Sequence, residues 1–153
     1  MRAVEASTYG ARLREAMKTK PIYTVLQPHY NLVERAEYEA DLGLGVAPYF
    51  ALAAGFLSGK YRNAKDAEGK ARGGLVEKYF NDRGFAALAT LDEAAKEHSS
   101  TPARVALALL IAQPGITSPI ASATNEAQFE DLAGAANLRL SEESIRKLNE
   151  ASA

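Results

Sequence analysis

Small and polar residues occur at four places where a predicted strand is followed by a loop or a helix. They are Ser7–Thr8, Gln27, the segment from Tyr49 to Gly59, and the segment from Ala121 to Asn125. Parallel α/β folds bind ligands at the carboxyl ends of their strands, and a helix N-terminus attracts anions. Residues 121–125 place a threonine and an asparagine at the start of a predicted helix, which indicates a binding site for a phosphate or another anion. The alternative is that this pattern serves only as a helix cap.

The stretch PYFALAAGFLSGKYR combines an aromatic side chain, several small residues and two cations. Tyr49 offers a ring for stacking, the alanines and glycines permit close approach of the backbone, and Lys60 and Arg62 carry positive charge. Such a loop could cradle a pyrophosphate. The alternative is a half-buried strand aromatic followed by a solvated loop.

Residues for acid–base or metal chemistry are scarce. The chain has no cysteine, which excludes a disulfide framework, thiol catalysis and thiolate metal sites, and it has only two histidines. His98 ends a helical pattern and is expected at the surface. The seven tyrosines include no evident tyrosine–lysine pair that could act as a tuned general acid. We therefore predict no catalytic and no metal-binding residue.

Composition and charge indicate one globular domain with one core. The 153 residues are 47% hydrophobic, and 18 Lys+Arg against 19 Asp+Glu give a formal charge of −1. No strong field would attract nucleic acid or an anionic membrane. The longest apolar run, Val105–Ala112, is far shorter than the ~20 residues that span a bilayer, and the start MRAVEAST lacks the apolar stretch of a secretory signal. We expect a cytoplasmic chain.

Short β-like runs alternate with helical patterns, which predicts a parallel α/β fold. Strands are expected within residues 2–6, 22–27, 44–49 and 116–123. Helices are expected over 9–17, within 33–42, from Phe85, over 102–113 after an N-cap at Thr101, after an N-cap at Asn125, and from Ser141, with a surface loop over 63–74. The helix over 102–113 is apolar on nearly every face, so we expect it to be packed between other elements. A closed barrel of this kind needs eight strands and about 250 residues, so four strands correspond to half a barrel or to a small open sheet.

Four segments of this chain resemble the second half of aldo/keto reductase sequences, and they follow one another in the same order as in that family. They are MRAVEAST, VLQPHYNLVER, LGVAPYFALAAGFLSGKYR and TPARVALALLIAQPGITSPIASATNEAQFEDL, and they are most similar to bacterial members. The resemblance implies that residues 1–153 form half of a TIM-type (β/α)8 barrel, equivalent to strands five to eight. It also implies binding of a nicotinamide dinucleotide, usually NADP(H).

The resemblance assigns cofactor roles to particular residues. Ser7, Thr8 and Gln27 would hold the carboxamide, and Tyr49 would stack on the nicotinamide. The loop that covers the pyrophosphate would contribute Leu52, Gly55, Leu57 and Lys60, and the adenosine phosphate would be held by Ala123, Thr124, Asn125, Gln128 and Asp131.

Departures from the family pattern affect both cofactor preference and catalysis. The family usually has asparagine where Thr8 stands, and no Arg or Lys occupies Thr124, Asn125 or Gln128, so NAD is an alternative to NADP. The segment between the second and third strands is shorter than in relatives. The family's catalytic Asp, Tyr, Lys and His come from its first four strands, which have no counterpart here, and His29 lies in a segment of the cofactor half.

We therefore expect the nicotinamide-cofactor-binding half of an NADP(H)-dependent aldo/keto reductase, which reduces carbonyls to alcohols, inactive by itself because the tetrad is absent. The alternative is a non-catalytic remnant or engineered half-barrel fragment that acts as a structural or interaction domain, and a weaker one is a dinucleotide-sensing module. Open sheet edges and an uncovered apolar face predict self-association or a complementary half-barrel chain. No nucleic-acid or membrane partner is expected.

Overall fold

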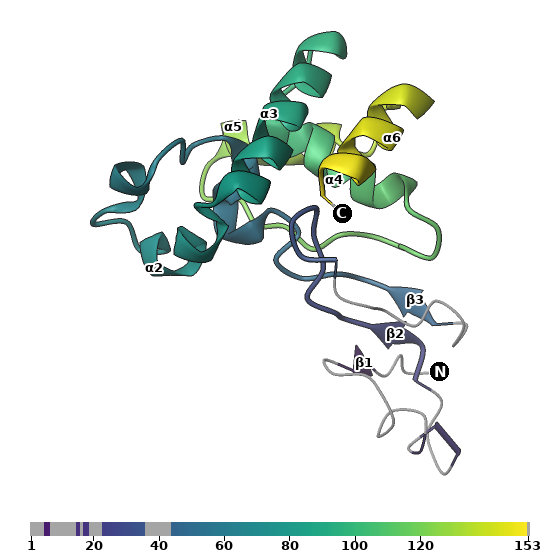
Figure 1. Ribbon diagram of the computed structural model, residues 1–153. Helices are drawn as coiled ribbons and strands as arrows, with labels where there is room; N and C mark the ends of the chain where they lie inside the picture. The colour runs from purple at the N-terminus through teal and green to yellow at the C-terminus, as the bar shows by residue number, and fades with distance from the viewer. Residues whose placement is uncertain (1–4, 7–14, 16, 19–22, 36–43, 153) are drawn as a thin grey trace.

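Figure 1 shows the computed structural model, which describes residues 5–6, 15, 17–18, 23–35 and 44–152. Its strands and its larger helices lie at different ends of the described part. The sheet is parallel, with β1 (Glu5–Ala6), β2 (Val25–Leu26) and β3 (Gly45–Val46) side by side in that order. The register pairs Ala6 with Leu26, and Leu26 with Val46. The predicted α/β class with parallel strands is confirmed.

The fourth predicted strand, within residues 116–123, follows β3 without becoming a regular strand. It forms one parallel bridge, Val46 with Ile116, and the Ile120 N–H donates to the Pro48 carbonyl at 2.8 Å. Pro119 interrupts the segment because proline has no N–H to donate to a ladder. The described strands are also shorter than expected, since each spans two residues.

Helical segments make up most of the chain after β3. In chain order they are η2 (Ala53–Ser58), η3 (Ala64–Ala67), α2 (Gly73–Val76), η4 (Glu77–Tyr79), α3 (Asp82–Glu97), α4 (Pro102–Ala112), α5 (Glu126–Gly134) and α6 (Glu142–Ala151). No helix in the described part of the chain is both long enough and apolar enough to cross a membrane.

Side chains at the N-caps explain where the four long helices begin. Asn81, Thr101, Asn125 and Ser141 each accept a hydrogen bond from the backbone N–H three residues further on. The predicted starts of α4, α5 and α6 are confirmed. The helix expected from Phe85 begins earlier, at Asp82, because Asn81 caps it.

Two other predicted segments differ from the structure or fall outside it. The expected surface loop over 63–74 contains η3, which a capping box at Asn63 stabilises, and the first residues of α2. Gly73 within it is buried, so this segment packs against the rest of the molecule more than predicted. The helices expected over 9–17 and within 33–42 lie mostly outside the described residues. Glu15 and Met17 have helical backbone, but residues 33–35 form a turn and a bridge rather than helix, because Asn31 pairs with Glu34.

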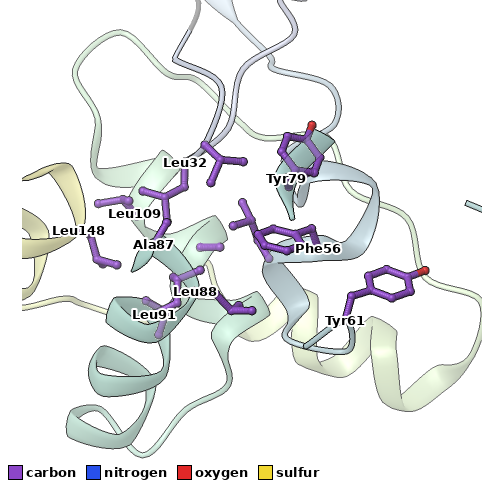
Figure 2. Packing of buried hydrophobic residues seen from close by; sticks show 14 of the residues in the cluster. Leu32, Phe56, Tyr61, Tyr79, Ala87, Leu88, Leu91, Leu109 and Leu148 are labelled. Carbon is purple, nitrogen blue, oxygen red and sulfur yellow. The ribbon is translucent and has the colours of Figure 1, made fainter. Parts of the chain in front are cut away.

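The main core lies among the helices rather than on the sheet, as Figure 2 shows. Leu32, Phe56, Leu91, Leu109 and Leu148 come from the segment after β2 and from η2, α3, α4 and α6, and all are buried in one cluster. Helix α4 packs against α3, α5 and η2. Its apolar residues from Val105 to Leu110 are buried on every side, which confirms the predicted central position.

The end of α3 is joined to the start of α6 by a polar network. The His98 Nε2 lies 3.2 Å from the Ser144 hydroxyl, and the Glu97 carboxylate accepts hydrogen bonds from the hydroxyls of Ser141 and Ser144. His98 was predicted at the surface, but α6 covers it and leaves its side chain 15% exposed. That prediction was wrong because the helical pattern did not reveal which later element packs on this end of α3.

Candidate functional site

The carboxyl ends of β2 and β3 lie next to each other. The ladder continues past both strands, because the Tyr49 N–H donates to the Pro28 carbonyl at 3.0 Å and His29 pairs with Tyr49 in a parallel bridge. Gln27 and Tyr49, both predicted from the sequence, are half-buried at these ends. Ser7 and Thr8 lie outside the described residues, although β1 just before them pairs with β2. The sheet therefore brings Gln27 and Tyr49 to one edge.

The loop after Tyr49 has an unusual backbone. Phe50, Ala53 and Ala54 have φ values of 56°, 50° and 56°, and Gly55 and Gly59 also have positive φ. Alanine and phenylalanine rarely adopt this left-handed region, and such residues are concentrated at functional sites. Phe56 and Leu57 hold the loop in place because both side chains are fully buried in the core. Leu57 thus contributes an anchor, whereas Leu52 is only partly buried beside the two core clusters.

The two cations of this loop have different environments. Arg62 is engaged, because its guanidinium pairs with both oxygens of Asp92 and its Nε donates to the Gly59 carbonyl. Lys60 is exposed, and its ammonium lies 4.9 Å from the centre of the Tyr61 ring. It forms no ion pair with a carboxylate in the described part of the chain. Gly55 has a φ of 97°, which favours glycine, and a Cβ there would lie 2.8 Å from the Lys60 Nζ, so the lysine would have to move away.

Residues 116–120 run beside β3, because Ile116 bridges to Val46 and the Ile120 N–H donates to the Pro48 carbonyl. Helix α5 begins a few residues after this segment. Thr124 donates both its backbone N–H and its hydroxyl to Oε1 of Gln128, at 3.0 and 2.9 Å. Asn125 caps the helix through the Gln128 N–H at 2.9 Å. The Gln128 side chain therefore bonds to Thr124 rather than to Asn125, so the expected capping box is formed only in part. Ala123 precedes this turn and is half-buried.

Asp131 differs from the other predicted residues of α5 because it faces α4. Its two carboxylate oxygens accept from the Thr101 hydroxyl at 2.8 and 2.9 Å, and one of them lies 3.3 Å from the Arg104 guanidinium. The Arg104 Nε also donates to the Asp131 carbonyl at 3.0 Å. Asp131 is thus engaged in holding α5 against the start of α4.

Helix α5 presents an open apolar groove next to these polar groups. None of its own residues is buried, and Phe129 is 65% exposed. The groove has a volume of about 240 Å³, and its lining includes Ile111 of α4, Ala123 and, from α5, Phe129 and Leu132. The apolar stripe predicted for α5 exists, but within the described part of the chain nothing covers it.

A polar cluster centred on Glu34 was not predicted. The Glu34 carboxylate lies 2.5 Å from the Lys78 ammonium, 2.5 Å from the Tyr79 hydroxyl and 2.5 Å from Nε2 of His29. Lys78 and Tyr79 are adjacent in the sequence and both contact this carboxylate. Their adjacency in the sequence was visible, but their shared partner 44 and 45 residues earlier was not.

The electrostatics of this cluster favour a charged Glu34 and a neutral Tyr79. Burial alone raises the pKa of the Glu34 carboxyl, but the hydrogen bonds from Lys78 and Tyr79 and the nearby His29 outweigh it and hold that pKa below its usual value. Burial and donation to Glu34 raise the pKa of the Tyr79 phenol well above its usual range. Tyr79 therefore keeps its proton and is not tuned as a general acid near neutral pH.

Known proteins resemble the chain in both sequence and fold. An oxidoreductase of Bacillus subtilis, YrpG, described as uncharacterized, is 36% identical over 145 residues, and L-glyceraldehyde 3-phosphate reductase of Escherichia coli O157:H7 is 30% identical over 138. These alignments cover 89% and 81% of this chain but 43% and 40% of the relatives. The crystal structure of a thermostable aldo-keto reductase, Tm1743, with the inhibitor epalrestat has a TM-score of 0.70 at 24% identity, covering 97% of this chain and 48% of that one.

The chain thus spans less than half the length of these relatives, while its own length is matched almost completely. The similar structure supports the aldo-keto reductase type of α/β fold for the strands and helices described above. The sequence pattern of the aldo/keto reductase family matches residues 1–153, from before β1 to after α6. With its strand ends, its left-handed loop and its capped α5 all inside that match, the chain belongs to the aldo/keto reductase family.

Proposed function

We propose that these residues form the nicotinamide-cofactor-binding half of an oxidoreductase that uses NADP(H), or NAD(H), to reduce a carbonyl to an alcohol. The observation that supports the proposal most is the side-by-side arrangement of the ends of β2 and β3, which carry Gln27 and Tyr49. The left-handed loop with Lys60 follows directly from Tyr49. The start of α5 follows the segment that runs beside β3.

The chemistry of the described residues fits such a cofactor. Tyr49 supplies a half-buried ring for the nicotinamide, and Gln27 supplies a polar group for the carboxamide, to which Ser7 and Thr8, outside the described residues, would add. A cation, Lys60, lies over Gly55, where a Cβ would fill the space that the lysine occupies. A negatively charged pyrophosphate would be attracted to that ammonium.

The remaining assigned residues have supporting roles in this proposal. Leu57 anchors the loop in the core and Leu52 lines it, while Ala123, Thr124, Asn125 and Gln128 surround the N-terminus of α5, which favours a phosphate. Asp131 acts indirectly, by holding α5 on α4. When bound, the cofactor supplies the hydride for carbonyl reduction.

We also infer that residues 1–153 bind the cofactor without turning over a substrate. Hydride transfer to a carbonyl needs a proton donor positioned at the carbonyl oxygen. Tyr79, which lies beside Lys78 in the described structure, has a raised pKa and donates to Glu34 instead. Turnover would then require catalytic groups from a complementary half of the barrel.

A titration with NADPH and, separately, with NADH tests the proposal, with nicotinamide fluorescence as the readout. We expect saturable binding that Tyr49→Ala and Lys60→Ala weaken. Lys65→Ala is the matched control, because Lys65 is an exposed lysine a few residues away in η3. Absence of binding by the unmodified chain up to about 1 mM, which corresponds to roughly 4 kcal/mol, would contradict the proposal.

One observation favours an interaction function in addition, namely the exposed groove on α4 and α5. An apolar surface of this kind is typical of an interface. We propose that it is covered by a second copy of the chain or by a chain that carries the complementary half-barrel.

Sedimentation of the purified chain distinguishes the two occupants of the groove. Self-association that Phe129→Ser reduces would support a second copy, with Leu75→Ser as the control because Leu75 is 50% exposed but lies outside the groove. A monomer at all concentrations would contradict self-association and would leave the complementary chain as the proposed partner.

A further inference from the structure

The Glu34 cluster lies next to Tyr49 but has no role in the function proposed above. His29 connects the two. Its ring centre is 5.1 Å from that of Tyr49 with the planes 30° apart, and 5.2 Å from that of Phe50. Its Nε2 faces the Glu34 carboxylate at 2.5 Å. The histidine ring therefore contacts the predicted stacking residue on one side and lies against the Glu34 carboxylate on the other, without a hydrogen bond from Nε2 within the described part of the chain.

Glu34 is held in place from two directions. On its own segment, the buried Asn31 accepts hydrogen bonds from the backbone N–H groups of Val33 and Glu34, both at 3.0 Å. From η4, more than forty residues later, Lys78 and Tyr79 bind both oxygens of the carboxylate. Because two separate segments fix it, Glu34 is a rigid support for His29 rather than a mobile surface carboxylate.

The same segment also holds the backbone beside Tyr49. The Asn31 side chain donates to the Phe50 carbonyl at 3.1 Å, and Phe50 has the left-handed φ of 56° at which the loop turns. Asn31 thus fixes the chain direction directly after Tyr49. The backbone on one side of Tyr49 and the ring face toward His29 are both determined by residues 29–34.

We propose that His29, which lies between the Tyr49 ring and the Glu34 carboxylate, is a positioning residue that fixes the plane of the Tyr49 ring for stacking on the nicotinamide. This inference rests on the proposed function. A ring that is already fixed loses less conformational freedom when a planar ligand stacks on it, so preorganisation increases affinity. His29 and Glu34 need not touch the cofactor for this effect.

Two ligands separate positioning from general damage to the fold. NADPH uses the whole site, whereas 2′,5′-ADP contains only the adenosine end, which the proposed function assigns to the start of α5. We expect His29→Leu to weaken NADPH binding roughly three- to tenfold, the range of an aromatic contact, and to leave the affinity for 2′,5′-ADP unchanged. Glu34→Gln preserves the side-chain shape and should give a smaller loss of the same kind. His98→Leu, the matched control, should change neither affinity.

A double-mutant cycle shows whether His29 acts through Tyr49. In a chain that already carries Tyr49→Ala, the His29→Leu change should have no further effect on NADPH binding. In the cofactor-free chain, the NMR signals of the Tyr49 ring should shift in His29→Leu and in Glu34→Gln, which reports ring placement without any ligand.

Three results would overturn the proposal. Equal NADPH affinity in His29→Leu and in the unmodified chain would remove the positioning role while leaving the proposed function intact. Independent effects of the two substitutions in the cycle would show that His29 does not act through Tyr49. If the unmodified chain binds neither NADPH nor NADH, the proposed function fails and this inference fails with it.

Discussion

Helices α4 and α5 pack against each other but differ in how much of their apolar surface is buried. In α4, seven residues from Ala103 to Leu110 are buried, whereas α5 has none. Both helices begin at a polar N-cap followed by apolar side chains at helical spacing. The difference lies in their neighbours, because α4 also packs on α3 and η2. An apolar stripe thus determines which face of a helix is available for packing, while the surrounding elements determine whether that face is buried.

The two ends of the described molecule differ in a related way. At the helical end, apolar side chains from the segment after β2 and from η2, η3, α2, η4, α3, α4 and α6 pack around Phe56 and Leu109, as Figure 2 shows in part. At the strand end, two-residue strands are followed by the polar contacts of His29, Asn31 and Glu34. The stability of the first end should therefore depend on packing, and the geometry of the second on charge and hydrogen bonds.

Truncation of one apolar side chain in each helix should give the largest contrast. Leu109→Ala in α4 removes a fully buried side chain and should lower the free energy of unfolding by about 2–5 kcal/mol. Phe129→Ala in α5 removes a side chain that is 65% exposed and should cost less than about 1 kcal/mol. Urea unfolding followed by circular dichroism measures both. Equal costs would mean that the α5 stripe is covered in solution.

Glycine-to-alanine substitutions in α3 and α5 should distinguish a tightly packed helix from one with a more open surface. In Gly84→Ala, the new Cβ would overlap the Tyr79 carbonyl at the start of α3, which should cost about 1–3 kcal/mol. In Gly134→Ala at the end of α5, it would meet the Arg104 guanidinium at 2.5 Å, and this flexible side chain can move away. Thermal unfolding of the two variants should show a clear loss only for Gly84→Ala. A similar loss in both would indicate that Arg104 is held rigidly.

Removal of the contact between α4 and α5 should have a moderate effect. Asp131→Ala eliminates the partly exposed ion pair with Arg104 and the hydrogen bonds from Thr101, and should cost about 1 kcal/mol. Hydrogen exchange of the α5 amides should accelerate more than that of the α4 amides. If NADPH affinity falls while exchange in α5 is unchanged, Asp131 instead contacts the cofactor directly.

Acid should lower the free energy of unfolding through protonation of Glu34, beside the strands. This is the smallest of the four predicted effects. The native interactions lower the pKa of Glu34 below its ordinary value of 4.5, so its stabilising contribution is complete above that pH and is lost as the pH falls through the lowered pKa. Urea unfolding at a series of pH values between about 3 and 6 should show this loss. Glu34→Gln should reduce the pH dependence in this range, and an unchanged dependence would assign it to other carboxylates.

The sequence predicted the local features of the fold well. Thr101, Asn125 and Ser141 were identified as helix starts, because a capping side chain acts on a backbone N–H only three residues away. Pro28 was identified as the end of the second strand, where proline can no longer donate to the sheet, whereas the third strand was expected through Pro48 and ends at Val46. Gln27 and Tyr49 were assigned to neighbouring strand ends, and the ladder confirms that position.

Features that depend on distant segments were not predicted. The burial of His98 depends on α6, which packs on the end of α3 although Ser144 lies 46 residues further along the chain. The exposed state of α5 could not be inferred either, since its residues have the spacing of a buried stripe. In each case the deciding partner is a side chain or a face whose position is set by packing.

The sequence by itself determined the family through its motifs. It also determined the parallel α/β class and the starts of α4, α5 and α6, because short-range hydrogen bonds and backbone restrictions control these features. The tertiary structure alone decided that Lys78 and Tyr79 meet Glu34 and that Arg62 is paired with Asp92. It also decided that, among the residues it describes, Lys60 has no carboxylate partner and the α5 stripe is not covered. Electrostatic contacts and burial depend on distances between segments that are tens of residues apart in the chain, and these distances exist only after the core has packed.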